Sequence, residues 1–240
     1  MVESFKIRAE HLKRYLKISV NLPKDYNNSL VTYPLILVFD GQLFYNFLNE
    51  ETRVIETEKI ISSISKDFIC ITLQSPTINE WRISELNPYY NGESTKVDTV
   101  LSLIYYDYIA KELLPLLKNR YRINNNIYLL GYKEGAISSL YMLYAYDEFK
   151  GAGIFSIPLK DCSKKLKEDL INRFTCKKDL FLAYGGLNTD TKDDDLFYNL
   201  CTQLDSLKVE KLKYEFYENE DNSYNILKNH LKDFFNFILP

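Results

Sequence analysis

The chain has 240 residues, of which 46% are hydrophobic, and its 33 acidic and 30 basic side chains give a net charge of -3. A chain of this length and composition can bury a complete core, and we expect one domain over residues 1–240. Because acidic and basic residues are mixed along the sequence, no basic surface is available for nucleic acid.

Strands and helices alternate from the start of the chain. Lys13–Leu22 alternates like a half-exposed strand and runs into a turn at Pro23–Tyr26. The continuous apolar run Leu35–Phe39 is typical of a central strand in a parallel sheet. The next predicted elements are a helix at about Leu43–Ile64, a strand at Phe68–Leu73, a long polar loop at Gln74–Lys96 and a helix at Val97–Arg120.

The second half of the sequence continues the same alternation. Its predicted elements are strands at Ile127–Leu130, Gly153–Ile157, Leu180–Tyr184 and Leu212–Tyr217, and helices at Ala136–Tyr146, near Leu166, at Asp194–Leu207 and at Tyr224–Leu239. This order predicts the α/β class, with a central, mostly parallel twisted sheet, helices on both faces and an antiparallel N-terminal edge. Ligands of such sheets bind at the carboxyl ends of the strands.

The amino terminus lacks the apolar segment of a signal peptide, and no apolar stretch is long enough to cross a membrane. We therefore expect a cytoplasmic protein without a membrane partner. The four cysteines show no Cys-x-x-Cys spacing and the chain has two histidines, His11 and His230, so there is no zinc signature. The sequence thus predicts no metal and no cofactor.

The pentapeptide Gly131–Gly135, with the sequence Gly-Tyr-Lys-Glu-Gly, joins a predicted buried strand to a predicted helix. It has the spacing of a Gly-x-Ser-x-Gly nucleophile elbow, with Lys133 in place of the serine. In such an elbow the glycines allow a sharp turn, and the central residue is held strained above the sheet. An ordinary strand-to-helix turn is the alternative interpretation.

Five further segments, taken in order, carry a resemblance to one family. They are Val20–Tyr26 (V-x-L-P-x-x-Y), Tyr33–Gly41 (a strand ending in Asp-Gly), Arg82–Pro88 (R-x-x-[DE]-[LF]-[TN]-P), Leu114–Tyr121 (a helix ending in tyrosine) and Phe149–Pro158 (F-x-G…S-P). Together they resemble the esterase D and enterochelin-esterase-like branch of the α/β-hydrolases over nearly the whole chain. The resemblance implies an α/β-hydrolase fold, and an ester hydrolase whose triad follows the order serine, acid, histidine.

All three triad positions implied by this resemblance carry other residues. Lys133 stands at the serine position, Asn188 at the acid position and Asn222 at the histidine position. An amide has no usable pKa near neutrality, so Asn222 cannot act as the base that a serine nucleophile needs. Neither His11 nor His230 is placed to substitute for it.

The resemblance also implies an oxyanion hole built from backbone donors. Its two N–H groups would come from Glu134 and from one residue of the turn Gly41, Gln42, Leu43. Backbone donors do not depend on side-chain identity, so the hole could outlast the triad. The retained glycines are equally explained by the needs of the fold alone.

Lys133 leaves one unconventional chemistry open. The amino terminus of a helix, together with burial, favours a neutral amine that could form a Schiff base. Glu134 and other acids would favour the ammonium instead. We expect the ammonium to pair with a carboxylate and to fill the former pocket.

Two functional classes follow from these residues. The first is a non-catalytic member of the family that binds an unknown small molecule or protein partner. Its candidate binding residues are Tyr132, Trp81, Arg82, Glu85 and the aromatic residues Tyr89 and Tyr90 of the predicted loop. The second class is an active carboxylic-ester hydrolase with an atypical or misassigned catalytic set. The absence of a Gly-x-Ser-x-Gly serine favours the first class, and the sequence leaves a homodimer open.

Overall fold

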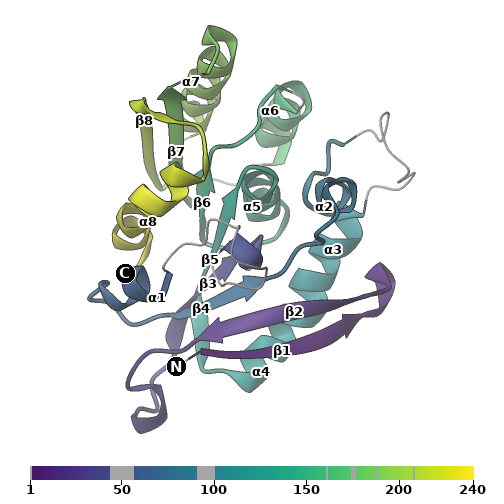
Figure 1. The fold of residues 1–240 in the computed structure, drawn as a ribbon, viewed down its shortest axis with the longest axis vertical. Coiled ribbons are helices and arrows are strands. Elements are labelled where there is room, and N and C mark those ends of the chain that lie inside the picture. The colour runs from purple at the N-terminus through teal and green to yellow at the C-terminus, as the bar shows by residue number, and fades with distance from the viewer. Residues whose placement is uncertain are drawn as a thin grey trace.

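The computed structural model of the chain describes residues 2–43, 57–90, 101–160, 162–173, 177–187, 189–207 and 209–240. One eight-stranded sheet, with strand order β1-β2-β4-β3-β5-β6-β7-β8, runs through it (Figure 1). The strands are β1 (Val2–Ala9), β2 (Arg14–Asn21), β3 (Tyr33–Val38), β4 (Ile69–Leu73), β5 (Ile123–Tyr132), β6 (Gly151–Phe155), β7 (Asp179–Leu187) and β8 (Lys211–Asp221). The pairs β1/β2 and β2/β4 are antiparallel and the others are parallel, which confirms the predicted sheet and its N-terminal edge.

The central strands are buried because helices cover both faces of the sheet. Every residue of β3, β4 and β6 is buried, as expected for continuous apolar runs in a parallel sheet. Side chains of α1 and α8 form one apolar layer, and side chains of α3 to α7 form the other. The helices are α1 (Thr57–Ser62), α2 (Asn79–Leu86), α3 (Ser102–Tyr108), α4 (Leu114–Arg120), α5 (Glu134–Ala145), α6 (Ser163–Arg173), α7 (Thr191–Ser206) and α8 (Tyr224–Ile238).

The first strand was absent from the sequence prediction, which began the sheet at Lys13. β1 pairs with β2 along its whole length, from Val2 opposite Asn21 to Ala9 opposite Arg14. The alternation of apolar and basic residues over Phe5–Arg8 was the available signal.

The predicted polar loop over Gln74–Lys96 is wrong in its middle, where the chain forms α2. The polar composition of this segment hid the helix. Ser84, Glu85 and Leu86 are nevertheless buried, so tertiary contacts rather than an apolar stripe stabilise it. The part of the predicted loop over residues 91–96 lies outside the described residues.

Two predicted helices differ from the expected continuous ones. Between α3 and α4 the chain makes a π-helical turn, η4, over Ile109–Leu113. Pro115 at the start of α4 lacks an N–H, which explains why an ordinary α-helical ladder is interrupted here. Of the helix predicted at Leu43–Ile64 the structure describes a short 3-10 turn, η3 (Gly41–Leu43), and α1, whereas residues 44–56 lie outside the described ones.

Three strands end in a residue with positive φ at the carboxyl edge of the sheet. These residues are Asp40 after β3 (56°), Lys133 after β5 (50°) and Ser156 after β6 (50°). Positive φ disfavours residues with side chains. At each of these residues the chain changes direction sharply. The turns that follow therefore lie at the same edge of the sheet, which is where the candidate site lies.

Candidate functional site

Lys133 occupies the tip of a strand-to-helix elbow between β5 and α5. Its φ of 50° and ψ of -119° are strained for a residue with a side chain. Its N–H donates to the carbonyl oxygen of Phe155 at a distance of 3.0 Å, which ties the tip to β6. A Cβ on Gly131 would lie 1.9 Å from the carbonyl oxygen of Gly135. No side chain fits at Gly131, so the strand, turn and helix depend on this glycine.

The side chain of Lys133 is exposed, and its Nζ lies 5.6 Å from the centre of the Tyr132 ring. Among the described residues, no carboxylate lies within ion-pairing distance of this ammonium. The expectation that Lys133 pairs with an acid and fills the pocket is therefore not met in the described part of the chain. The ammonium remains available at the carboxyl edge.

Arg82 of α2 instead forms ion pairs with the two carboxylates next to the elbow, those of Asp40 and Glu134. Its Nε and Nη2 donate to Asp40 Oδ1 and Oδ2 at 2.9 and 2.6 Å, and its Nη1 donates to Glu134 Oε2 at 2.6 Å. Asp40 is fully buried, and both Arg82 and Glu134 have side chains that are 17% exposed. We call Asp40, Arg82 and Glu134 the Arg82 cluster. Its bidentate geometry is that of a strong, charge-assisted ion pair.

The carboxylates of the Arg82 cluster affect the pKa of Arg82, and Asp40 also holds the neighbouring turn η3 through Gln42. Burial by itself would lower the pKa of Arg82, but the charges of Asp40 and Glu134 and their hydrogen bonds raise it overall. Gln42 donates from Nε2 to Asp40 Oδ1 (3.1 Å) and accepts from the N–H of Ser75 (3.1 Å). The Gln42 side chain is thus buried in a structural network.

A second ion pair fixes α2 from its other side. Arg14 of β2 donates from Nε to Glu85 Oε2 at 2.8 Å and makes a second, shorter contact to Glu85 Oε1. Glu85 is 1% exposed, and its burial raises the pKa of its carboxyl although Arg14 acts to lower it. The two charged residues of α2 that were predicted to bind a ligand, Arg82 and Glu85, therefore have partners within the protein.

The turns expected to form an oxyanion hole lie side by side. Gly41 opens η3 and Glu134 opens α5, and a Cβ on Gly135 would lie 3.5 Å from Asp40 Oδ2. A Cβ on Gly41 would approach the Thr72 side chain to 2.8 Å, so this glycine is needed for close packing on β4. Leu43 ends η3, and its side chain lies outside the described part.

Asn222 lies directly after β8, before α8 begins. Its Oδ1 accepts a long hydrogen bond of 3.5 Å from the N–H of Gly185 in β7. The rings of Tyr132 and Tyr224 meet edge to face at 6.2 Å, which connects the elbow to the start of α8. Asn188 lies outside the described residues. The structure thus brings the elbow and the Asn222 turn to one edge of the sheet.

The aromatic candidates have different environments. Trp81 is exposed, but Tyr89 is buried, and its hydroxyl lies 2.6 Å from that of Tyr144 and 3.1 Å from Asp169 Oδ2. The prediction that Tyr89 contacts a ligand at the surface is therefore wrong. Its hydroxyl instead joins the segment after α2 to α5 and α6. Tyr132 is also buried, and burial first and the charge of Glu134 second raise its pKa.

The contacts of the two histidines among the described residues are with groups outside the elbow turn. His230 lies within α8, stacks on Tyr217 at 3.6 Å and contacts Glu220 Oε1 through Nε2 at 2.8 Å. His11 lies in the turn between β1 and β2, and its Nε2 is 3.8 Å from Glu112 Oε1. Each imidazole therefore has an acidic neighbour: Glu112 lies far along the chain from Lys133 and Asn222, whereas Glu220 precedes Asn222 by two residues.

Within the described ranges, no group of three or more histidine, cysteine, aspartate or glutamate side chains could hold a metal ion. No helix in those ranges is both long and apolar enough to span a membrane.

The Arg82 cluster was missed by sequence reasoning. The Asp-Gly at the end of β3 and the Arg-x-x-Glu of α2 were visible, but nothing in the sequence paired them.

The sequence model of a family described as "Putative esterase" matches residues 9–229 of the chain. No protein with a curated description matches it.

Among solved structures, the IroE-like serine hydrolase from Shewanella oneidensis superposes with a TM-score of 0.75 at 18% identity, covering 98% of this chain and 81% of that one. The BES protein from Bacillus cereus gives 0.75 at 20% identity, with 100% and 96% covered. Siderophore hydrolase EstB from Aspergillus nidulans gives 0.71 at 17% identity, with 99% and 95% covered. At such identities the likeness establishes the fold, which is the predicted α/β-hydrolase fold.

Proposed function

Because this chain belongs to the putative esterase family but has lysine at the elbow, we propose that it is a non-catalytic member that binds a ligand or partner there. The observation that carries the proposal is the distribution of charge around Lys133. The ammonium of Lys133 is exposed and has no ion-pair partner among the described residues, whereas Arg82 holds the carboxylates of Asp40 and Glu134.

Acyl transfer requires a nucleophile that an adjacent base can deprotonate. Asn222 at the histidine position has an amide that accepts a hydrogen bond from Gly185, and an amide cannot take a proton near neutral pH. The imidazole of His230 in α8 contacts the carboxylate of Glu220 in β8. These contacts support loss of the serine-esterase reaction.

The same arrangement favours a ligand that presents a negative group. Lys133 supplies a full positive charge at the amino terminus of α5, where the helix dipole also attracts anions. The neighbouring rings of Tyr132 and Tyr224 add an apolar wall. We therefore propose an anionic group, such as a carboxylate on a small molecule or on a protein partner, as the recognised feature.

Loss of catalysis is tested with activated aryl esters and a fluorophosphonate probe. We expect no turnover and no stoichiometric labelling, because no Ser-His pair generates an alkoxide. The triple variant Lys133→Ser, Asn188→Asp, Asn222→His should gain ester hydrolysis if the backbone donors at Glu134 and Gly41 survive. Stoichiometric labelling of the native protein would instead establish the active-hydrolase alternative.

Binding at the elbow is tested with benzoate, whose ring and carboxylate match the two features of the site. Titration should shift the backbone amide signals of Glu134 and Gly135 saturably in the native protein. Lys133→Gln should abolish the shifts, whereas Lys150→Gln, at the opposite edge of the sheet where β6 begins, should not. Unchanged shifts in Lys133→Gln would remove the elbow from the binding site.

A further inference from the structure

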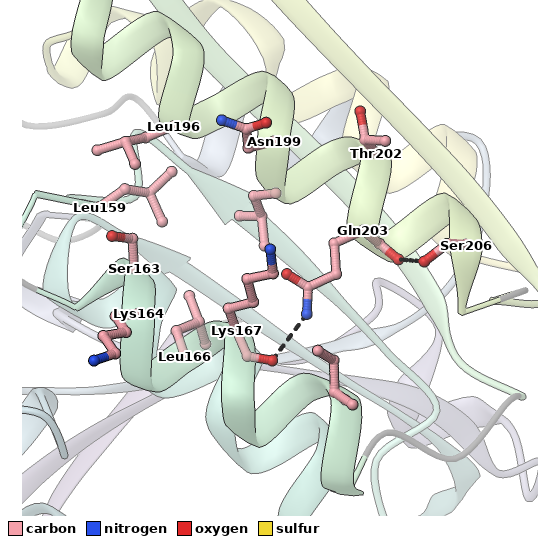
Figure 2. A pocket seen from close by; sticks show the side chains of 12 residues that line it. Leu159, Ser163, Lys164, Leu166, Lys167, Leu196, Asn199, Thr202, Gln203 and Ser206 are labelled. Atoms are coloured by element: carbon pink, nitrogen blue, oxygen red, sulfur yellow. Dashed lines mark hydrogen bonds between the residues drawn. The ribbon is translucent and has the colours of Figure 1, made fainter.

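A groove between α6 and α7 is separate from the elbow and is unused by the proposed function. Its volume is about 630 Å³, within the range of about 300–1,000 Å³ typical of small-molecule sites. Figure 2 shows its two walls, with α6 on one side and α7 on the other. We call it the α6–α7 groove.

The floor of the α6–α7 groove is aliphatic. Leu159, Leu166, Leu196 and Leu200 line it, and Ile171 at one end is 59% exposed. Transfer of an aliphatic side chain of that size out of water is favourable in free energy. The floor therefore favours an apolar ligand chain lying along the two helices.

The charge on the groove has one sign. Its lining includes Lys164 and Lys167 and no acidic residue. Lys164 lies in the first turn of α6, where the helix dipole disfavours cations, and Lys167 is the fifth residue of the helix. Neither has an ion pair among the described residues. Both ammonium groups are therefore available to an anion bound in the groove.

Lys167 is the better placed of the two lysines. In Figure 2 its side chain extends between the helices, whereas the ammonium of Lys164 points away from α7. The backbone of Lys167 is fixed across the groove, because Gln203 Nε2 donates to its carbonyl oxygen at 2.9 Å. Asn199 of α7 is exposed on the opposite wall and has no hydrogen-bond partner among the described residues.

We propose that the α6–α7 groove binds a carboxylate with an unbranched apolar chain. The carboxylate contacts the Lys167 ammonium and the Asn199 amide, and the chain lies on Leu159, Leu166 and Leu196. A partner helix is less well matched, because four of the five aliphatic side chains lie on the floor rather than on an exposed face.

The experiment titrates sodium dodecanoate, below its micelle concentration, into the full chain and follows binding by calorimetry. We expect saturable binding with one site per chain. Dodecanol has the same chain without the charge, and acetate has the charge without the chain, so both should bind at least tenfold more weakly. Equal affinity for dodecanol, or no saturable binding of dodecanoate, would overturn the proposal.

Three variants locate the carboxylate. Lys167→Gln keeps the side-chain stem and removes the charge, and it should weaken dodecanoate binding about tenfold, as expected for one charge-assisted contact. Lys165→Gln is the matched control, because this exposed lysine lies on the same helix outside the groove, and its affinity should stay within about twofold. Asn199→Asp places a negative charge on the opposite wall and should abolish binding.

Circular dichroism of each variant confirms that it is folded before its affinity is compared. Equal losses in Lys165→Gln and Lys167→Gln would show general charge attraction and would overturn the assigned site. Binding of an acidic amphipathic peptide in preference to dodecanoate would also overturn it. Because the variants leave Lys133 unchanged, the outcome is independent of ligand binding at the elbow.

Discussion

The two sides of the elbow use their charges differently. On the α2 side, Arg82 holds Asp40 and Glu134, and Arg14 holds Glu85, so the charges of both α2 residues are neutralised within the protein. On the α8 side, Lys133 is exposed beside Tyr132, whose ring meets Tyr224 and is also influenced by the charge of Asp221.

The difference is between charged side chains that stabilise the fold as buried ion pairs and a charged side chain, Lys133, that is exposed to solvent. Removing one partner of a buried ion pair leaves an uncompensated charge, so such pairs resist replacement one residue at a time. A residue at an exposed turn, such as Lys133, carries no such penalty when it changes. The ion pairs on the α2 side are therefore expected to tolerate single substitutions less well than the exposed turn at Lys133.

The largest expected effect is on the α2 side. Arg82→Ala leaves the fully buried Asp40 and the largely buried Glu134 without their cation, and it should lower the free energy of unfolding by about 3–5 kcal/mol. Urea denaturation measures this change. Arg8→Ala is the control, because Arg8 and its partner Glu10 are both exposed, and it should change stability little. Similar losses in the two variants would contradict the comparison.

A smaller effect of opposite sign is expected at Lys133. Lys133→Gly should relieve the positive φ of 50° and raise the free energy of unfolding by roughly 1 kcal/mol. Lys133→Ala removes the same side chain but keeps the strained backbone, so it should give no such gain. Destabilisation by Lys133→Gly, measured under the same denaturation conditions, would show that Lys133 contributes contacts to the fold.

The smallest expected effect is the pH dependence of the Arg14–Glu85 pair. Burial raises the pKa of Glu85 above its ordinary value of 4.5, so the folded protein binds this proton more tightly than the unfolded chain. The stability that this group contributes is present below pH 4.5 and is lost as pH rises through the raised folded pKa. The free energy of unfolding of Glu85→Gln, relative to the native protein, should therefore increase with pH across that window.

The control for the pH experiment is Glu10→Gln, which removes an exposed carboxylate. Its difference from the native protein should stay nearly constant over the same pH values, since water screens the charge. A constant difference for Glu85→Gln as well would show that burial of Glu85 does not affect folding.

Local spacing was sufficient to predict much of the fold and the elbow. The apolar runs of β3 to β7 and the helical spacing of α5 and α8 reflect burial against near neighbours, which leaves a periodic pattern. The glycine frame predicted the turn at Lys133 because close backbone contact requires glycine at a given position. The ion pairs of the site left no comparable pattern in the sequence.

The Arg82 cluster escaped prediction because its members are distant in sequence. Arg82 pairs with residues 42 and 52 positions away, and a single ion pair imposes no repeat on the sequence. The helix α2 was missed for a related reason, since long-range contacts of Arg82 and Glu85 stabilise a segment with polar composition. Tyr89 was misplaced on the surface because the partners of its hydroxyl, Tyr144 and Asp169, lie in two later helices.

The contact at Gly131 affects how relatives of this chain can be recognised. Any Cβ there would lie 1.9 Å from the Gly135 carbonyl oxygen, so selection for a folded protein alone would preserve this glycine after every trace of acyl transfer was gone. The presence of this glycine in a relative therefore indicates a folded strand, turn and helix, and it carries no information about the reaction.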